Sequence, residues 1–261
     1  MKPSTLFKDV GHSILAFLSA FGAGGIVLGD ALKGVVSGNV RARNRIIEQM
    51  AVVGIESLPI VLITLLFGGM VIGLQTAKEL IMYGASQYSG SIVSLSVARE
   101  IAPTLTGIVV AARIGSAFAA ELGAMRITNQ IDAMRALAID PVRYLVTPRL
   151  VAAAIMLPVL TMFGNVMGLI GGLLTSLNVG ISYQTFMNSA ANYLTVYDIA
   201  GGLLKTMVFG IIIAITACYI GLNTEGGAAG VGRSTTSAVV WSIVLLYGSN
   251  FIMSWLLYAF R

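Results

Sequence analysis

Charged residues, cysteine and histidine are scarce in this chain of 261 residues, and each scarcity excludes a class of protein. Only 10% of the residues are charged, whereas a soluble globular domain carries about a quarter. The one cysteine, Cys218, excludes an internal disulfide, and the one histidine, His12, excludes a histidine-cluster metal site. The sequence contains no G-x-x-x-x-G-K-[ST] phosphate-binding loop, no HExxH pattern and no nucleophile elbow. We therefore do not expect this chain to be an enzyme or to hydrolyse nucleotide itself.

Apolar residues dominate the composition instead. They make up 57% of the chain, and residues 150–197 contain no Asp, Glu, Lys or Arg. About 20 apolar residues cross the hydrocarbon core of a bilayer as a helix, so such runs exceed what a soluble core needs. We predict an all-α integral membrane protein with a five-span domain at residues 49–261. The predicted spans are residues 50–77 (interrupted only by Glu56), 92–120, 150–177, 199–222 and 238–260.

Residues 1–48 have a different pattern from the spans. Phe7, Val10, Ile14 and Leu18 fall on one helical face, which predicts a helix lying in the membrane interface. Basic residues follow at positions 33, 41, 43 and 45 and mark a loop. Basic residues are concentrated in 1–48 and 121–149, so the positive-inside rule places both segments and the N-terminus in the cytoplasm.

The segment at residues 121–149 is polar and amphipathic. Ile127, Ile131, Met134 and Ala138 recur at helical spacing before Pro141, which predicts a short cytoplasmic helix. Its acidic and basic residues are mixed, unlike the basic face of a helix that binds a lipid surface. This mixture favours docking against a protein, and the alternative is an ordinary loop helix resting on the membrane.

Ionisable residues also lie inside the predicted spans. Arg99, Glu100 and Arg113 lie in the second span and Lys205 lies in the fourth. Charges within a bilayer are costly and mark functional sites by default. Pro103 follows the first two and is expected to kink the helix. The alternatives are that Arg99 and Glu100 neutralise one another and only fix packing, and that Lys205 snorkels to the interface.

The second span and the segment after it carry a more specific signal. The stretch AREIAPTLTGIVVAARIGSAFAAELGAMRITNQIDAMRALAIDPVRYLVTPR, together with TEGGAAGVGRSTTSAVV near the C-terminus, resembles the MlaE/YrbE family of ABC transporter permeases. ELGAM followed by QIDAM and DP is its most discriminating part. The resemblance implies the permease subunit of a system that moves phospholipid between the bacterial inner membrane and a periplasmic MCE-domain protein.

The same resemblance implies partners and site residues. The partners are a second copy of the chain, a cytoplasmic ABC ATPase that binds ATP and Mg²⁺, and a small cytoplasmic STAS-type subunit; this chain itself holds no cofactor and no metal. The segment 121–149 resembles a coupling helix that docks onto the ATPase, with candidate contacts at Glu121, Met125, Ile131, Asp132, Met134 and Arg135. Arg99 and Glu100 match the polar pair near the lipid cavity.

Additional substrate contacts are expected from the residues alone. A lipid has a polar head and apolar tails, so its path needs a polar site beside an apolar wall. We expect Lys205 at the polar site, and we expect the glycine-rich end of the first span to supply the wall through Leu66, Met70 and Leu74. An alternative function is a self-sufficient secondary transporter of a small solute. Such transporters often contain inverted repeats, and the two halves of this chain show none.

Overall fold

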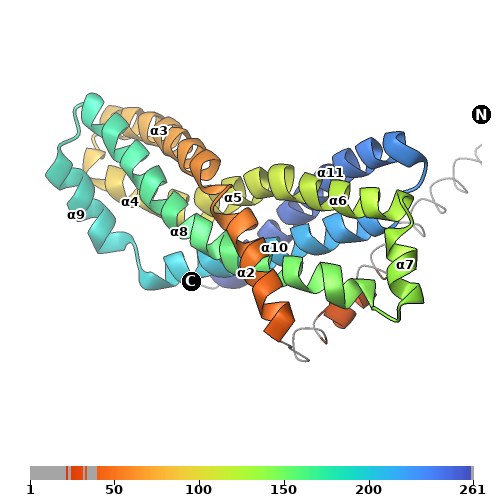
Figure 1. The fold of residues 1–261 in the computed structure, drawn as a ribbon. Coiled ribbons are helices and arrows are strands. Elements are labelled where there is room, and N and C mark those ends of the chain that lie inside the picture. The colour runs from red at the N-terminus through yellow and green to blue at the C-terminus, as the bar shows by residue number, and fades with distance from the viewer. Residues whose placement is uncertain (1–21, 23–24, 32, 34–39, 260–261) are drawn as a thin grey trace, which may run out of the picture.

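The computed structural model describes residues 22, 25–31, 33 and 40–259, and every regular element in this part of the chain is a helix (Figure 1). The all-α prediction is therefore confirmed. The expected interfacial helix around Phe7 to Leu18 lies outside the described residues. The elements are α2 (Val40–Gly54), α3 (Leu58–Met82), η1 (Ser86–Tyr88), α4 (Ser89–Ser96), η2 (Val97–Ile101), α5 (Ala102–Val110), η3 (Ala111–Gly115), α6 (Ser116–Ile127), α7 (Gln130–Ala136), η4 (Val142–Val146), α8 (Thr147–Asn178), α9 (Tyr183–Tyr193), α10 (Val196–Leu222) and α11 (Gly227–Tyr258).

Five helical stretches of the described chain are long and apolar enough to cross a membrane. They are Arg43–Met82, Ser86–Ile127, Val142–Asn178, Val196–Leu222 and Gly227–Tyr258. The first four predicted spans each lie within one of these stretches. The protein is therefore a multi-pass membrane protein.

Three segments differ from the predicted connections. Residues 40–48 were expected in a loop and form the start of α2. Residues 178–197 contain the helix α9, whose N-terminus is capped by the Ser182 hydroxyl accepting from the Thr185 N–H at 3.2 Å. The connection expected between the fourth and fifth spans is shorter than predicted: Gly226 and Gly227 turn the chain with φ values of 87° and 66°, and α11 begins at Gly227. A Cβ on Gly230 would collide with the carbonyl oxygen of Glu225, which lies just before this helix.

Three of the spanning stretches are not uniform α-helices, the third because it begins with the π-turn η4. The first is broken at residues 55–57 between α2 and α3, and Pro59 lies in the first turn of α3. The second contains two turns of π-helix, η2 and η3, which hold Arg99 and Glu100 and then Arg113. Such π-turns inside α-helices are frequent at functional sites.

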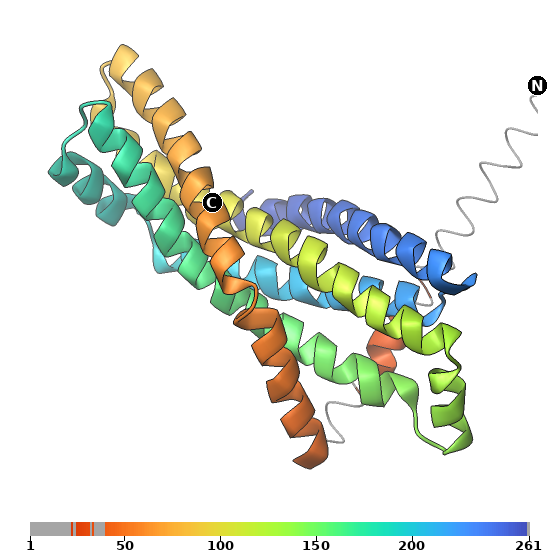
Figure 2. The same cartoon turned by 45° about the horizontal axis from the view of Figure 1, so that its top comes forward.

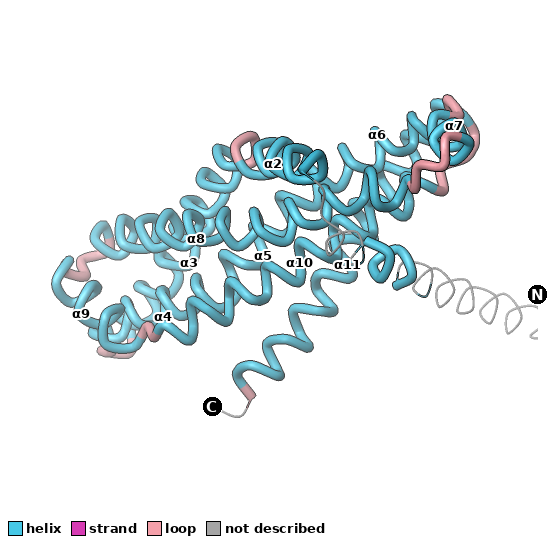
Figure 3. The backbone as a smooth tube through the Cα atoms, turned by 60° about the horizontal axis from the view of Figure 1, so that its bottom comes forward, coloured by secondary structure: helices cyan, strands magenta, loops and turns pink. Residues whose placement is uncertain are grey.

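The helices form two groups that meet near the middle of the molecule. α3, α4, α8 and α9 extend to one end, whereas α6, α10 and α11 lie side by side and extend toward the other end (Figures 1 and 2). α7 lies at the far tip of the second group, opposite α9 (Figure 3). We call these tips the α7 end and the α9 end.

Glycines allow α3 and α8 to approach closely. A Cβ on Gly69 would collide with the backbone of Gly168, and one on Gly73 would collide with the backbone of Gly172. A third glycine near this end of α3, Gly68, packs instead against Leu105 of α5. Small residues at such crossings let two membrane helices gain close van der Waals contact. These glycines therefore serve the close packing of α3 against α8 and α5.

This crossing predicts that Gly69→Ala lowers the stability of the protein. The new methyl group has to push the two backbones apart, at a cost of about 1–3 kcal/mol. The measurement is thermal unfolding in detergent. Gly248→Ala in α11 is the matched control, since a Cβ there meets nothing within 4 Å and alanine is the better helix former by about 1 kcal/mol. Equal melting temperatures for the two variants would contradict this packing account.

Candidate functional site

The site begins at the π-turn η2, which carries Arg99 and Glu100. The Ala102 N–H bonds to the Val97 carbonyl five residues earlier, which widens the helix at this turn. Pro103 has no N–H to donate to the Arg99 carbonyl four residues before it. That carbonyl accepts a hydrogen bond from Lys205 Nζ of α10 at 2.8 Å. Proline and the π-turn thus open the helix backbone to a side chain from another span.

Lys205 is completely buried, with 0% of its surface exposed. Besides the Arg99 carbonyl, its ammonium group donates to Glu100 Oε1 at 2.7 Å and to the Ser254 hydroxyl of α11 at 2.7 Å. An ammonium group has three donors, so all of them are used. The alternative that Lys205 snorkels to an interface is therefore wrong.

Glu100 lies at the centre of this network. Its Oε1 accepts from Lys205 and also from the Ser254 hydroxyl at 2.8 Å, and its Oε2 accepts from Asn250 Nδ2 at 3.0 Å. The Glu100 side chain is nevertheless 44% exposed. It therefore connects the buried ammonium group of Lys205 to the accessible surface of the helices.

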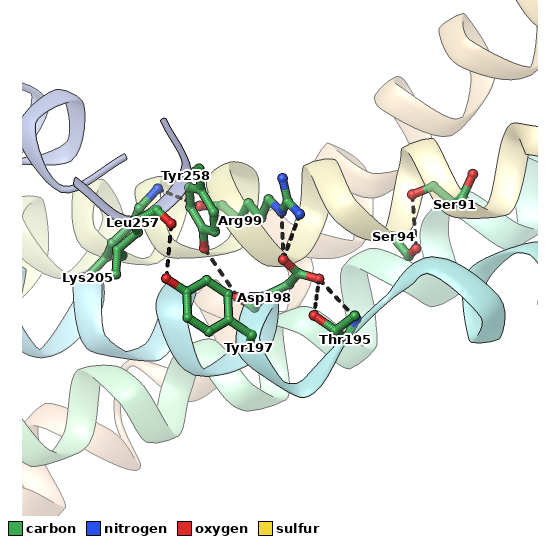
Figure 4. Close-up of polar contacts among 9 residues, drawn as sticks. All are labelled: Ser91, Ser94, Arg99, Thr195, Tyr197, Asp198, Lys205, Leu257 and Tyr258. Atoms are coloured by element: carbon green, nitrogen blue, oxygen red, sulfur yellow. Dashed lines mark hydrogen bonds and ion pairs between the residues drawn. The ribbon is translucent and has the colours of Figure 1, made fainter. Parts of the chain in front are cut away.

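Arg99 forms a separate ion pair with Asp198 of α10 (Figure 4). Its Nη2 and Nε lie 2.7 and 2.9 Å from Asp198 Oδ1, and its guanidinium group lies over the ring of Tyr258, 4.7 Å from the centroid. The other oxygen of Asp198 accepts from the Thr195 N–H and hydroxyl at 3.0 and 2.6 Å. The alternative that Arg99 and Glu100 neutralise one another is wrong, because each has its own counter-ion on α10: Asp198 for Arg99 and Lys205 for Glu100.

Several members of this network were missed at the level of the sequence. Asp198 fell between the expected connection at 178–197 and the expected span at 199–222. The pattern Thr195-x-x-Asp198 is a capping box that starts α10, and it marks Asp198 as the third helical residue. Asn250 and Ser254 are four residues apart and share a face of α11, a spacing that would have found them as a polar pair.

The predicted apolar wall lies on a neighbouring helix. Leu66 and Met70 of α3 are half-buried, and Leu74 is 38% exposed. The backbone at Leu66 and Met70 lies against Gly171 of α8, and α3 also contacts η2. The structure thus brings Arg99, Glu100 and Lys205 together and places the wall residues on the adjacent helix.

A second polar contact lies at the other π-turn. Arg113 of η3 donates to Glu56 Oε2 at 2.6 Å and to the Ser57 hydroxyl at 3.0 Å, and it approaches the Val52 carbonyl at 3.4 Å. These three acceptors surround the break between α2 and α3. Arg113 therefore holds that break to the helix that carries Arg99 and Glu100.

The predicted coupling segment is two helices rather than one. α6 ends at Ile127, Asn129 is left-handed with φ 59°, and α7 covers only Gln130–Ala136. Ala138 lies beyond α7 and is also left-handed, with φ 57°. The short helix predicted through all four apolar positions is thus confirmed only for Ile131 and Met134.

The candidate coupling residues differ in accessibility. Glu121 belongs to α6 and pairs with Arg149 at 2.7 Å, and Met125 is half-buried on the same helix. Ile131 is 1% exposed and Met134 is half-buried, so both face the protein itself. Asp132 pairs with Arg126 and Arg135 at 2.8 and 3.4 Å, and these groups remain at the surface.

Comparison with known proteins shows the family to which this chain belongs. A sequence profile described as Permease MlaE matches residues 46–256. The chain belongs to the MlaE permease family. It is 46% identical to a probable ABC transporter permease of Synechocystis over 95% of this chain and 94% of the relative, and 41% identical to one of Rickettsia typhi over 82% and 83%. It is 40% identical to the chloroplastic protein trigalactosyldiacylglycerol 1 of Arabidopsis thaliana, over 88% of this chain and 65% of that protein.

An MlaE permease is a transport subunit rather than an enzyme. Its ABC type implies an ATPase as partner, which agrees with the absence of a phosphate-binding loop from the sequence. The alternative of a self-sufficient secondary transporter is therefore wrong.

Lys205 is buried and Glu100 is partly exposed, so we expect removal of the Glu100 charge to lower the stability of the protein more than removal of the Lys205 charge. Glu100→Gln leaves the Lys205 ammonium group buried without an anion, at a cost of about 3–5 kcal/mol. Lys205→Met is expected to cost less, because Glu100 is partly exposed and keeps Asn250 and Ser254 as donors. The double variant is expected to recover most of the stability lost in Glu100→Gln.

Thermal unfolding of the three variants in detergent measures this asymmetry. Lys33→Met is the control, because the pair of Lys33 with Asp30 is exposed and such pairs contribute about 0–1 kcal/mol. A Lys205→Met variant that loses as much stability as Glu100→Gln would refute the assignment of Lys205 as the group that needs a counter-ion.

Proposed function

We propose that this MlaE permease is the membrane subunit of an ABC transporter that moves phospholipid between the bacterial inner membrane and a periplasmic MCE-domain protein. The observation that carries the proposal is the polar network inside the spans: two ion pairs beside apolar helices, with Glu100 and Arg99 partly exposed. A lipid needs such a pairing of a polar site with an apolar wall. The name of the Arabidopsis relative, which contains a galactolipid, supports a lipid as cargo.

The proposed transporter contains two copies of this chain. A partly exposed carboxylate and guanidinium within the spans would be costly against lipid tails, so the face that bears them calls for protein or a polar cavity. A homodimer with its central cavity beside the second span satisfies that need. The wall of the cavity is formed by Leu66, Met70 and Leu74, and its polar site by Arg99, Glu100 and Lys205.

We place the α7 end in the cytoplasm and the α9 end toward the periplasm. The excess of basic residues in 1–48 and 121–149 supports this orientation and a cytoplasmic N-terminus. The MCE-domain protein then meets the α9 end, whereas the ATPase, which binds ATP and Mg²⁺, and a small STAS-type subunit meet the cytoplasmic face.

The ATPase docks on the outer side of α7. Ile131 and Met134 anchor α7 to the permease, which leaves Asp132, Arg135 and Leu137 on the outside. Leu137 follows α7 directly and is 73% exposed. A large apolar side chain at the tip of a water-exposed helix is a suitable anchor for a pocket on a partner.

Leu137→Asp is therefore expected to weaken the binding of the ATPase on the order of tenfold, which corresponds to loss of one apolar anchor. The measurement is co-purification of the ATPase with the permease, together with ATP hydrolysis by the complex. Val196→Asp is the matched control, because Val196 is 83% exposed at the start of α10, three residues after α9. If Leu137→Asp retains the ATPase as well as Val196→Asp does, the docking surface has been assigned to the wrong side of α7.

A further inference from the structure

The polar network is electrically balanced. It contains two cations, Arg99 and Lys205, and two anions, Glu100 and Asp198, each in an ion pair of 2.7 Å. A site of zero net charge does not attract an anion over a neutral or zwitterionic group through its overall field. Selection at this site therefore depends on which of the four groups a ligand can reach.

Two of the four groups are unavailable to a ligand. Lys205 is 0% exposed and its three donors are used within the protein. Asp198 is 1% exposed, and both of its oxygens accept hydrogen bonds from Arg99 or Thr195. The buried pair members thus fix the network without taking part in recognition.

The two accessible groups have opposite charge and are adjacent in the chain. The side chains of Arg99 and Glu100 are 33% and 44% exposed. Arg99 uses Nε and Nη2 for Asp198, and its remaining guanidinium nitrogen points away from Asp198 (Figure 4). A guanidinium group has five N–H donors, so this nitrogen can still donate. The π-turn therefore presents one cationic donor beside one anionic acceptor.

We propose that this pair selects a zwitterionic lipid head group, with the phosphate on Arg99 and an ammonium group on Glu100. The proposal rests on the lipid function proposed above and adds the class of head group. A head group that carries only a negative charge would gain from Arg99 and be repelled by Glu100. An uncharged sugar head group would find hydrogen bonds but no opposite charges.

The test measures which lipids the full chain retains. The permease, in complex with its partners, is placed in nanodiscs that contain equal amounts of phosphatidylethanolamine, phosphatidylglycerol and monogalactosyldiacylglycerol. After extraction, native mass spectrometry identifies the lipids that stay bound. The double variant Glu100→Gln/Lys205→Met is the control, because it keeps zero net charge but removes the exposed carboxylate. Lipids bound elsewhere on the surface are common to both proteins.

The wild type is expected to retain phosphatidylethanolamine over phosphatidylglycerol by roughly threefold or more, and the double variant is expected to lose this preference. Glu100→Gln alone leaves a net positive site and is expected to shift retention toward phosphatidylglycerol. If that single variant is too unstable to purify, the comparison of lipid preference between the wild type and the double variant is sufficient to test the proposal.

The possible failures separate the two proposals. Equal retention of the three lipids by the wild type, preference for phosphatidylglycerol or the galactolipid, or unchanged preference in the double variant overturns the zwitterion proposal and leaves lipid transport standing. Retention of none of the three lipids by the wild type overturns the assignment of this network as a lipid site altogether.

Discussion

The structure depends on the need of one buried ammonium group for oxygen partners. Lys205 has no exposed surface within a span, and an unpaired charge there is costly unless it is neutralised and hydrogen-bonded. Its three acceptors come from the backbone of η2, from Glu100 and from Ser254 of α11. A single side chain of α10 thus fixes the π-turn and the last helix in place, and Arg99 repeats the connection one residue earlier through Asp198.

One continuous helical stretch links this network to the rest of the molecule. Ser86–Ile127 carries Glu100 in its first π-turn, Arg113 in its second, and α7 directly after its end. Arg113 ties the stretch to the break between α2 and α3. In the proposed transporter, a displacement at α7 therefore acts on the same helix that presents the lipid site and on the helix that forms its apolar wall.

Much of this architecture was predictable because hydropathy and helical length are local properties of the sequence. The five spans follow from apolar runs, and Arg99, Glu100 and Lys205 stood out because charges are rare within them. Their pairing was not predictable in this way. Arg99 and Glu100 are neighbours in the sequence, and only the packing of α10 shows that each has a different counter-ion.

The errors have physical causes of the same kind. The glycines at 226–232 were expected to form a loop, but only Gly226 and Gly227 have a positive φ, and the later ones lie within α11, since glycine can adopt a helical conformation as well as a turn. The apolar spacing from Ile127 to Ala138 suggested one helix, but Asn129 adopts a left-handed conformation that periodicity does not reveal. Asp198 was overlooked because it starts a span, where a carboxylate caps the helix and pairs with Arg99 at once.

The central claim is that the partly exposed pair Arg99 and Glu100 holds the polar head of a lipid. The most direct measurement is an electron cryo-microscopy structure of the assembled transporter in nanodiscs of phosphatidylethanolamine. A head group is expected within hydrogen-bonding distance of both side chains, with its acyl chains along α3. A structure in which another protein segment covers this pair, while ordered lipid lies elsewhere in the cavity, would contradict it.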